Sequence, residues 1–303
     1  MFWGCGFAWA KTAGETVNAT CNFPPGSPLG PIFVLAARFL GGGVLWLLIF
    51  PDARRGWSRR DVLRSFILGL VLAAGMIVQH LGLDRTSEAV SAFLTSLTIL
   101  FVPLMMTLVL RRPPRPILWV GVILATAGVW LMTGATPRGF GIGELLGLAC
   151  AFTYSIDIII VNYLITPASA SRLTAGQFLV VGLVNLLVCL FLPGGSGALA
   201  DAGKLLSMRE VGVNIALLTI FPTLGAFGLQ FRFQPRMDPS RAALIYLMEP
   251  IFASLFALIL NHRGLPAIAA AGAAMIVLAN LLVELVSARR PSPEQAINTP
   301  IID

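Results

Sequence analysis

Three ionisable side chains stand inside long apolar stretches of the sequence. They are Arg38, Asp157 and Glu249, and Pro250 directly follows the last of them. A charge near the centre of a bilayer costs about 2.5–3.5 kcal/mol even on lenient insertion scales, and proline removes a backbone donor. These side chains are therefore expected to face a polar interior.

Each of the three admits a functional and a structural interpretation. Arg38 is always charged and could grip an anionic group in a bidentate way, or it could neutralise Glu249 or Asp157. Glu249 could be a substrate or proton site, or a structural glutamate that fixes a bend at Pro250. Asp157 could line the interior as a binding residue or serve only as a pairing partner.

Neutral polar residues complete the predicted substrate pathway: Gln79, Thr95 and Gln230. Amides and hydroxyls also bond across helices without touching a ligand, which is the alternative for all three. His80 could line an outer mouth, or lie at an interface where water satisfies it. Prolines inside apolar stretches are predicted helix bends: Pro103, Pro222 and Pro250.

Composition places these residues in a membrane protein. The 303 residues are 57% hydrophobic and 12% charged, whereas soluble domains carry about 25% charged residues. The net charge of +7 comes from arginines in short loops, so it does not indicate nucleic-acid binding.

Other classes of site lack their motifs. Four cysteines share no close spacing and there are two histidines, so neither a disulfide framework nor a metal site is expected. HExxH, GxSxG and GxxxxGK[ST] motifs are absent, so we expect no enzyme, no cofactor and no ATP-driven pump.

Ten apolar stretches read as membrane-spanning helices. They cover about 2–15 (or to 20), 32–50, 62–83, 87–110, 117–133, 143–164, 177–192, 211–231, 240–260 and 266–286. A polar connection is expected over 194–210. Alternate loops hold fourteen against five Lys and Arg residues, which predicts that both termini are cytoplasmic.

The second half of the chain echoes the first. A shift of 153 positions pairs Ser87 with Ser240 and Phe93 with Tyr246. Five helices per repeat is an odd number, so the two repeats must be inverted, as in many secondary transporters. The expected fold is all-α and integral to the membrane, with repeats over 1–136 and 137–288 and a disordered tail over 289–303.

Several motifs carry a family resemblance: WGCGFAWAK, LAARFLGG, GLDRTSEAVSAFLTSLTILFVPLM, GVILATAGVWLM and PSRAALIYLMEPIFASLFALIL. With them the chain resembles the EamA-type branch of the drug/metabolite transporter superfamily. The resemblance implies ten helices in the inner membrane of a bacterium and export of small metabolites. Arg38 matches the family's Arg-Phe and Glu249-Pro250 its Glu-Pro. Asn261-His262-Arg263 departs from the family's usual Gly-Glu, and the first helix lacks the apolar residues that usually precede its Trp-Gly.

The expected function is that of a secondary transporter working by alternating access. It would move a small metabolite, such as an amino acid or a related amphipathic solute, across the lipid bilayer, with a proton as a candidate coupling ion. The protein would be a monomer or a homodimer. The alternatives are a structural or accessory membrane protein whose polar core only stabilises it, an intramembrane enzyme, and a channel.

Overall fold

A computed structural model of the chain describes residues 6–24, 26–83, 85, 93–111, 114–134, 141–248 and 266–288. These residues form helices and loops, with no strand among them. Five helices are long and apolar enough to cross a membrane: Leu29–Ile49, Arg59–Gly82, Ile142–Leu164, Ala170–Phe191 and Arg209–Arg236. Three shorter apolar helices are Phe93–Leu108, Pro116–Leu131 and Ala267–Val283. The fold class is therefore an all-α membrane bundle, and the count of ten spans stays a prediction.

The helices of the first half are α1 (Gly6–Thr20), α2 (Leu29–Ile49), α3 (Arg59–Leu83), α5 (Thr98–Leu108) and α6 (Pro116–Thr133), with a 3₁₀ turn at Pro51–Ala53. The second half begins with α7 (Ile142–Leu164), α8 (Ala170–Phe191), α9 (Gly195–Ala200) and α10 (Ala202–Ser207). It continues with α11 (Arg209–Leu218), a π-helix (Thr219–Phe227), α12 (Gly228–Phe233), a 3₁₀ turn (Gln234–Arg236), α13 (Pro239–Tyr246) and α15 (Ala267–Ala288).

The expected start of one helix in the second half was wrong. Helix α8 begins at Ala170 rather than near Gln177, because a turn closed by Ser169 Oγ on the Thr166 N–H, at 3.1 Å, starts the helix early. The connection expected over 194–210 is largely helical, as α9 and α10. Their apolar residues Ala198 and Leu205 are buried against α1 and α8, which stabilises these short helices.

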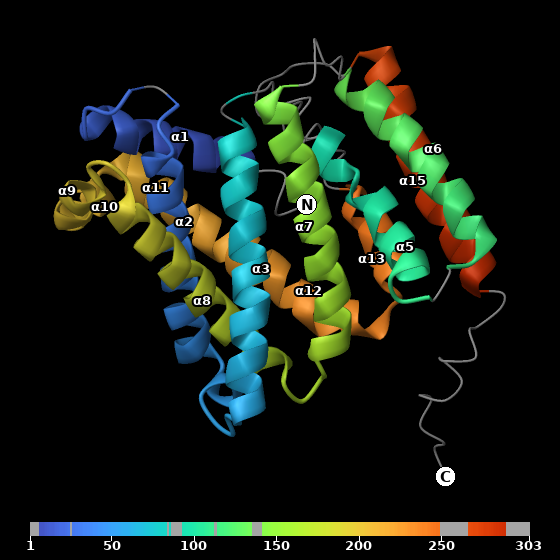
Figure 1. The fold of residues 1–303 in the computed structure, drawn as a ribbon, viewed down its shortest axis with the longest axis horizontal. Helices are drawn as coiled ribbons and strands as arrows, with labels where there is room; N and C mark the ends of the chain where they lie inside the picture. The colour runs from blue at the N-terminus through green and yellow to red at the C-terminus, as the bar shows by residue number, and fades with distance from the viewer. Residues whose placement is uncertain are drawn as a thin grey trace.

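Helices α3 and α7 stand side by side at the middle of the bundle (Figure 1). Helix α2 packs on α8, and α1 packs on α2 and α11 at one edge. The pair α6 and α15 forms the opposite edge, where the two helices run side by side (Figure 1). The middle of the bundle is therefore formed by α2, α3, α7, α8 and the π-helix.

Glycines let the central helices approach closely. A Cβ on Gly182 of α8 would lie 2.7 Å from the backbone nitrogen of Leu40. A Cβ on Gly43 of α2 would lie 2.7 Å from Leu179 Cδ2. These small residues thus serve helix–helix contact, as is common in membrane bundles.

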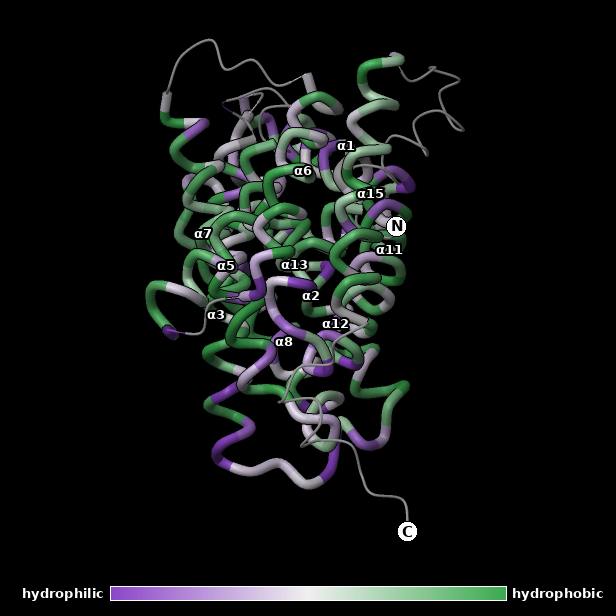
Figure 2. Tube along the Cα trace, turned by 90° about the vertical axis from the view of Figure 1, so that its right-hand side faces the viewer, coloured by the Kyte–Doolittle hydropathy of each residue, from purple (hydrophilic) through white to green (hydrophobic). Residues whose placement is uncertain are grey.

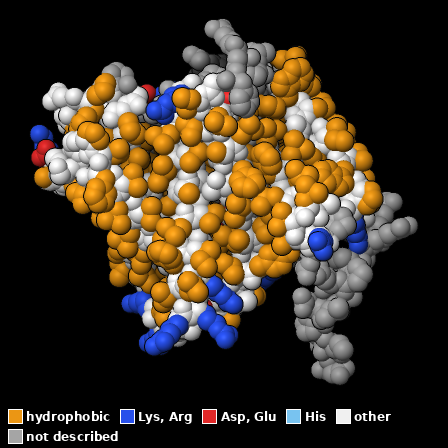
Figure 3. Space-filling view, in the orientation of Figure 1, with side chains coloured by type: hydrophobic (Ala, Val, Ile, Leu, Met, Phe, Trp, Pro, Cys, Tyr) orange, Lys and Arg blue, Asp and Glu red, His pale blue; other side chains and the backbone are white. Residues whose placement is uncertain are grey.

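Apolar residues cover the middle of the bundle and polar residues gather at its ends (Figure 2). On the face shown in Figure 3, Lys and Arg side chains cluster at the lower end, below a broad hydrophobic band. The exposed residues Arg54, Arg55, Arg59 and Arg60 lie where α2 leads into α3. Such an arrangement suits a protein surrounded by lipid.

Candidate functional site

Arg38 lies in the middle of α2 and is 6% exposed. Its Nε donates to Thr223 Oγ1 at 3.2 Å, and its Cζ lies 4.7 Å from the centroid of the Phe39 ring. Across the described residues, no carboxylate forms an ion pair with it. A buried guanidinium held by a hydroxyl and an aromatic ring keeps most of its charge uncompensated.

The π-helix presents Thr223 to Arg38. Pro222 lies within this stretch and has no N–H to donate, which a wider π turn accommodates. Thr223 Oγ1 donates to the carbonyl of Leu218, five residues earlier, at 3.0 Å. Thr219 Oγ1 also approaches the Arg38 carbonyl, at 3.4 Å. The local departure from α-helical geometry is thus part of how Arg38 is held.

A second set of polar groups comes from α3 and α7. The Tyr154 hydroxyl donates to Gln79 Oε1 at 2.8 Å, and the tyrosine ring fits against Gly75, where a Cβ would lie 2.6 Å from it. His80 Nδ1 lies 2.8 Å from the Met76 carbonyl. Because a carbonyl only accepts, Nδ1 carries the hydrogen.

This set lies beside Arg38. Phe39, next to Arg38 in the chain, shares one hydrophobic cluster with Met76 of α3 and Tyr154 of α7. Gln79, His80 and Tyr154 are half-buried although they belong to the central helices. The structure therefore brings Arg38 and Gln79 into one cluster.

Thr95 joins the same cluster through Cys150. Thr95 Oγ1 lies 3.9 Å from Cys150 Sγ, and the thiol also contacts Tyr154, one helical turn along α7. We call the group Arg38, Gln79, His80, Thr95, Tyr154 and Thr223 the central cluster. Its members come from α2, α3, α7, the π-helix and the segment before α5.

Asp157 belongs to a different polar group. It is 3% exposed, and its Oδ1 accepts from Gln177 Nε2 at 3.5 Å. The same Nε2 also lies 3.3 Å from the Leu68 carbonyl. The pairing of Asp157 with Arg38 considered from the sequence does not occur, because the aspartate is turned toward α8 and an amide.

Further amides and a tyrosine extend this second group, which we call the amide cluster: Asp157, Asn162, Gln177, Gln234 and Tyr246. Gln234 Nε2 donates to Asn162 Oδ1 at 3.0 Å, and Tyr246 donates to Gln234 Oε1 at 2.6 Å. Gln230 is 7% exposed on the neighbouring α12, and its Oε1 has no hydrogen-bond partner among the described residues. The amide cluster joins the second half of α7 to α8, to the 3₁₀ turn Gln234–Arg236 and to α13.

Two of the three prolines predicted to bend helices lie among the described residues. Pro103 lies inside α5 and Pro222 inside the π-helix. Glu249 and Pro250, where we predicted a binding residue and a bend, lie outside the described residues. The described part also holds no group of three His, Cys, Asp or Glu side chains that could bind a metal.

Sequence reasoning missed Thr223, Tyr154 and Gln177. Thr223 follows a proline inside an apolar stretch, and Tyr154 precedes Asp157 by one helical turn, so both positions carried a readable signal. Their partners are far away in the chain, however, and only the fold shows which helices meet.

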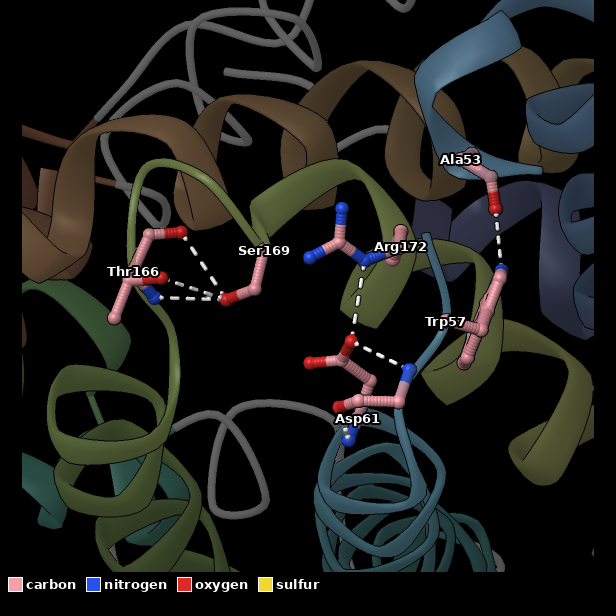
Figure 4. A network of polar contacts seen from close by, with 7 residues as sticks. Ala53, Trp57, Asp61, Thr166, Ser169 and Arg172 are labelled. Atoms are coloured by element: carbon pink, nitrogen blue, oxygen red, sulfur yellow. Dashed lines mark hydrogen bonds and ion pairs between the residues drawn. The ribbon is translucent and has the colours of Figure 1, made fainter. Parts of the chain in front are cut away.

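A third polar network lies at the arginine-rich end of the bundle (Figure 4). Arg172 Nε, at the start of α8, lies 3.2 Å from Asp61 Oδ2 at the start of α3. Asp61 Oδ2 also accepts from the Ser58 N–H, while Ser58 Oγ accepts from the Asp61 N–H, each at 3.1 Å. This reciprocal cap and the ion pair join the first turns of α3 and α8.

Comparison with known proteins places the chain in a family. The sequence model of the EamA-like transporter family matches residues 1–134 and 141–285. The chain belongs to the EamA-like transporter family. It is accordingly a multi-pass membrane protein of a family of transporters, not of enzymes, and the resemblance drawn from its motifs is confirmed.

Individual relatives are distant. The chain is 26% identical over 285 residues to an uncharacterized transporter of Archaeoglobus fulgidus, covering 94% of this chain and 83% of that protein. It is 24% identical over 273 residues to a chloroplastic WAT1-related protein of Arabidopsis thaliana, covering 84% of this chain and 63% of that protein. A crystal structure with 19% sequence identity shares the fold with a TM-score of 0.69, covering 96% of this chain and 97% of the other.

Proposed function

We propose that this EamA-like protein is a secondary transporter that exports a small metabolite by alternating access. The carrying observation is the central cluster, in which a buried arginine lacks a carboxylate partner among the described residues while neighbouring polar groups stay half-buried. A polar interior that only stabilised the bundle would be expected to pair its charges and close over them. This interior, with one charged and several neutral polar side chains, suits an amphipathic solute such as an amino acid.

The proposed pathway runs through the residues singled out in the sequence. Arg38, Gln79 and Thr95 would contact solute in the central cluster. Asp157 and Gln230 would act in or beside the amide cluster, and Glu249 would contribute from the ninth span. Coupling to protons would use Asp157 or Glu249.

Helix bends at Pro103, Pro222 and Pro250 would let spans pivot during the transport cycle. The π-helix supports this role at Pro222, since π turns interrupt the regular hydrogen-bond ladder of a helix. A gradient of the solute itself or of protons would drive this movement, so the proposal needs no cofactor.

Two inverted repeats, 1–136 and 137–288, would supply the two ways of opening. The family model matches two successive stretches, which supports a duplication. The packing supports it as well: α2 contacts α8, α5 contacts α13 and α6 contacts α15, each pairing corresponding helices of the two halves. Exchange of the halves also maps the α1–α11 contact onto the α7–α3 contact.

The charge distribution supports an inner-membrane orientation with both termini cytoplasmic. Under that orientation the network of Asp61 and Arg172 lies on the cytoplasmic side. Cysteines introduced at Ser58 and Ser207 test it with a membrane-impermeant maleimide, in a background without other cysteines. Labelling of Ser207→Cys but not Ser58→Cys in intact cells is expected, and labelling of both or neither would refute the inverted topology.

The transport activity is tested by comparing solute release from cells that lack and cells that overproduce the protein. We expect at least one small polar metabolite to accumulate outside the overproducing cells. Tyr154→Phe, at the central cluster, should reduce that release, whereas Tyr163→Phe on the outer face of α7 should not. Unchanged metabolite levels with protein present in the membrane would favour the structural or accessory role instead. Native gels of the detergent-purified protein distinguish a monomer from a homodimer.

A further inference from the structure

We infer that Arg38 is the binding site for a carboxylate group of the transported solute, so that the substrates are small solutes that carry a single carboxylate. This inference rests on the proposed transport function and adds the chemical class of the substrate. Three observations carry the inference: one edge of the Arg38 guanidinium is unoccupied, the charge around the guanidinium is uncompensated, and neighbouring groups hold the guanidinium in place.

The guanidinium uses one of its five N–H groups. Nε donates to Thr223, and within the described residues the two terminal nitrogens have no partner. Arg38 is 6% exposed, and neither terminal nitrogen is among the fully buried side-chain atoms without a partner. The edge formed by the two terminal nitrogens is therefore unoccupied within the described residues, and this edge matches the two oxygens of a carboxylate.

Among the described residues, the surroundings of Arg38 contribute no compensating charge. Thr223, Tyr154 and Gln79 are neutral, and the Phe39 ring offers a cation–π contact, with its centroid 4.7 Å from Arg38 Cζ. Asp157 is bonded to an amide on α8. One uncompensated positive charge beside neutral donors and acceptors suits one negative charge better than two, which favours a carboxylate over a doubly ionised phosphate.

Thr223 positions the guanidinium rather than competing for the solute. Its Oγ1 donates to the Leu218 carbonyl and can then only accept from Arg38 Nε, so the hydroxyl fixes the plane of the fork. Close packing against Gly42, where a Cβ would lie 2.8 Å from Thr223 Cγ2, holds the threonine rotamer. A pre-positioned arginine loses little freedom on binding, which is the condition for selective recognition.

The test measures binding to the purified full-length protein in a neutral detergent by thermal stabilisation. The probes are matched pairs of a carboxylate and its amide: acetate and acetamide, benzoate and benzamide, nicotinate and nicotinamide. We expect a carboxylate to raise the melting temperature while its amide does not, because only ligand that binds the folded state stabilises it. An equal response to both members of every pair, or no response to any carboxylate, would overturn the inference.

Variants separate the binding role from the folding role. Arg38→Gln should weaken carboxylate binding about 10- to 100-fold, as expected for loss of a charged hydrogen-bonded partner, and Arg38→Lys should recover part of it. Arg60→Gln, an exposed arginine at the end of the bundle, should leave binding unchanged. Thr223→Val keeps the charge of Arg38 but removes the hydrogen bond that fixes the plane of its guanidinium, so it should lower carboxylate affinity. This variant tests the inference even if Arg38→Gln does not fold.

A last experiment tests whether Arg38 is neutralised by Glu249 of the same chain. If Arg38→Gln and Glu249→Gln each remove the protein from the membrane and the double variant restores it, the two residues neutralise each other and the inference fails. Failure of the transport proposal looks different. Carboxylates would then bind in an Arg38-dependent way while the cells release no solute. Conversely, export of solutes at rates that Arg38→Gln does not change would preserve transport and refute the carboxylate site.

Discussion

The ion pair between Asp61 and Arg172 gives a prediction that can be worked out in energy. Arg172 Nε lies 3.2 Å from Asp61 Oδ2, and the two side chains are 20% and 8% exposed. At an effective dielectric constant near 20 the gross attraction is about 5 kcal/mol. Desolvation of both groups opposes most of this, which leaves a net coupling of about 1–2 kcal/mol. Asp61 also caps α3, which adds about 1 kcal/mol.

Arg172→Gln should therefore lower the free energy of unfolding by about 1–2 kcal/mol, and Asp61→Ala by about 2–3 kcal/mol, because it removes the cap as well. The double variant should lose at least about 1 kcal/mol less than the two single losses together. Arg60→Gln, an exposed neighbour, is the matched control and should change stability by less than about 0.5 kcal/mol.

Unfolding of the detergent-purified protein, followed by tryptophan fluorescence, measures these energies. Trp57 lies beside the network, with its Nε1 donating to the Ala53 carbonyl at 2.8 Å, so it reports on this region (Figure 4). A coupling energy below about 0.5 kcal/mol would fall within ordinary additivity and refute a stabilising pair. A larger loss for Arg60→Gln than for Arg172→Gln would also contradict the reasoning.

The other predictions concern packing, the central cluster and one thiol. Gly69→Ala would place a methyl 2.4 Å from the Val180 side chain on α8, so we expect it to lower the free energy of unfolding by about 1–3 kcal/mol. Gly197→Ala, with no atom within 4 Å of the added methyl, should be tolerated, and the same unfolding assay compares the two variants. Tyr154→Phe should cost about 1 kcal/mol by removing its hydrogen bond to Gln79, and an equal cost for the exposed control Tyr163→Phe would count against it. Burial, with a nearby carboxylate, raises the pKa of the Cys21 thiol. Because the thiolate is the nucleophile, maleimide labelling of Cys21 should rise at higher pH than labelling of Ser207→Cys, and coincident pH profiles would refute this.

Much of the helical layout could be predicted from apolar stretch length. The stretch expected over 143–164 is α7 at Ile142–Leu164, and the one over 266–286 is α15 at Ala267–Ala288. The start of α8 was missed because residues 170–176 are too polar on average to look like a span, although a serine-closed turn initiates the helix there. Helices α9 and α10 were missed because short helices depend on tertiary packing rather than on their own propensity.

The candidate site was predictable as a set of residue types but not as a set of partners. Arg38 stands out in any apolar stretch, yet its partner Thr223 is 185 residues away. Asp157 likewise finds Gln177 on another helix. Which polar groups meet depends on helix rotation and on a π turn, neither of which the hydrophobic pattern encodes. The inverted repeat and the roles of the pathway residues stay predictions.

The π-helix has a consequence for comparing relatives. A π turn contains one residue more than the α turn it replaces, so removing a single residue within Thr219–Phe227 would restore a regular helix. Because either kind of turn completes about one full rotation, that deletion would keep the flanking residues on their faces and change only the side chains that the turn itself presents. Relatives one residue shorter here would align without difficulty by apolar content, yet lack the wide turn that presents Thr223 to Arg38. A one-residue gap in this helix is therefore a marker for sorting members of the family by the lining of their pathway.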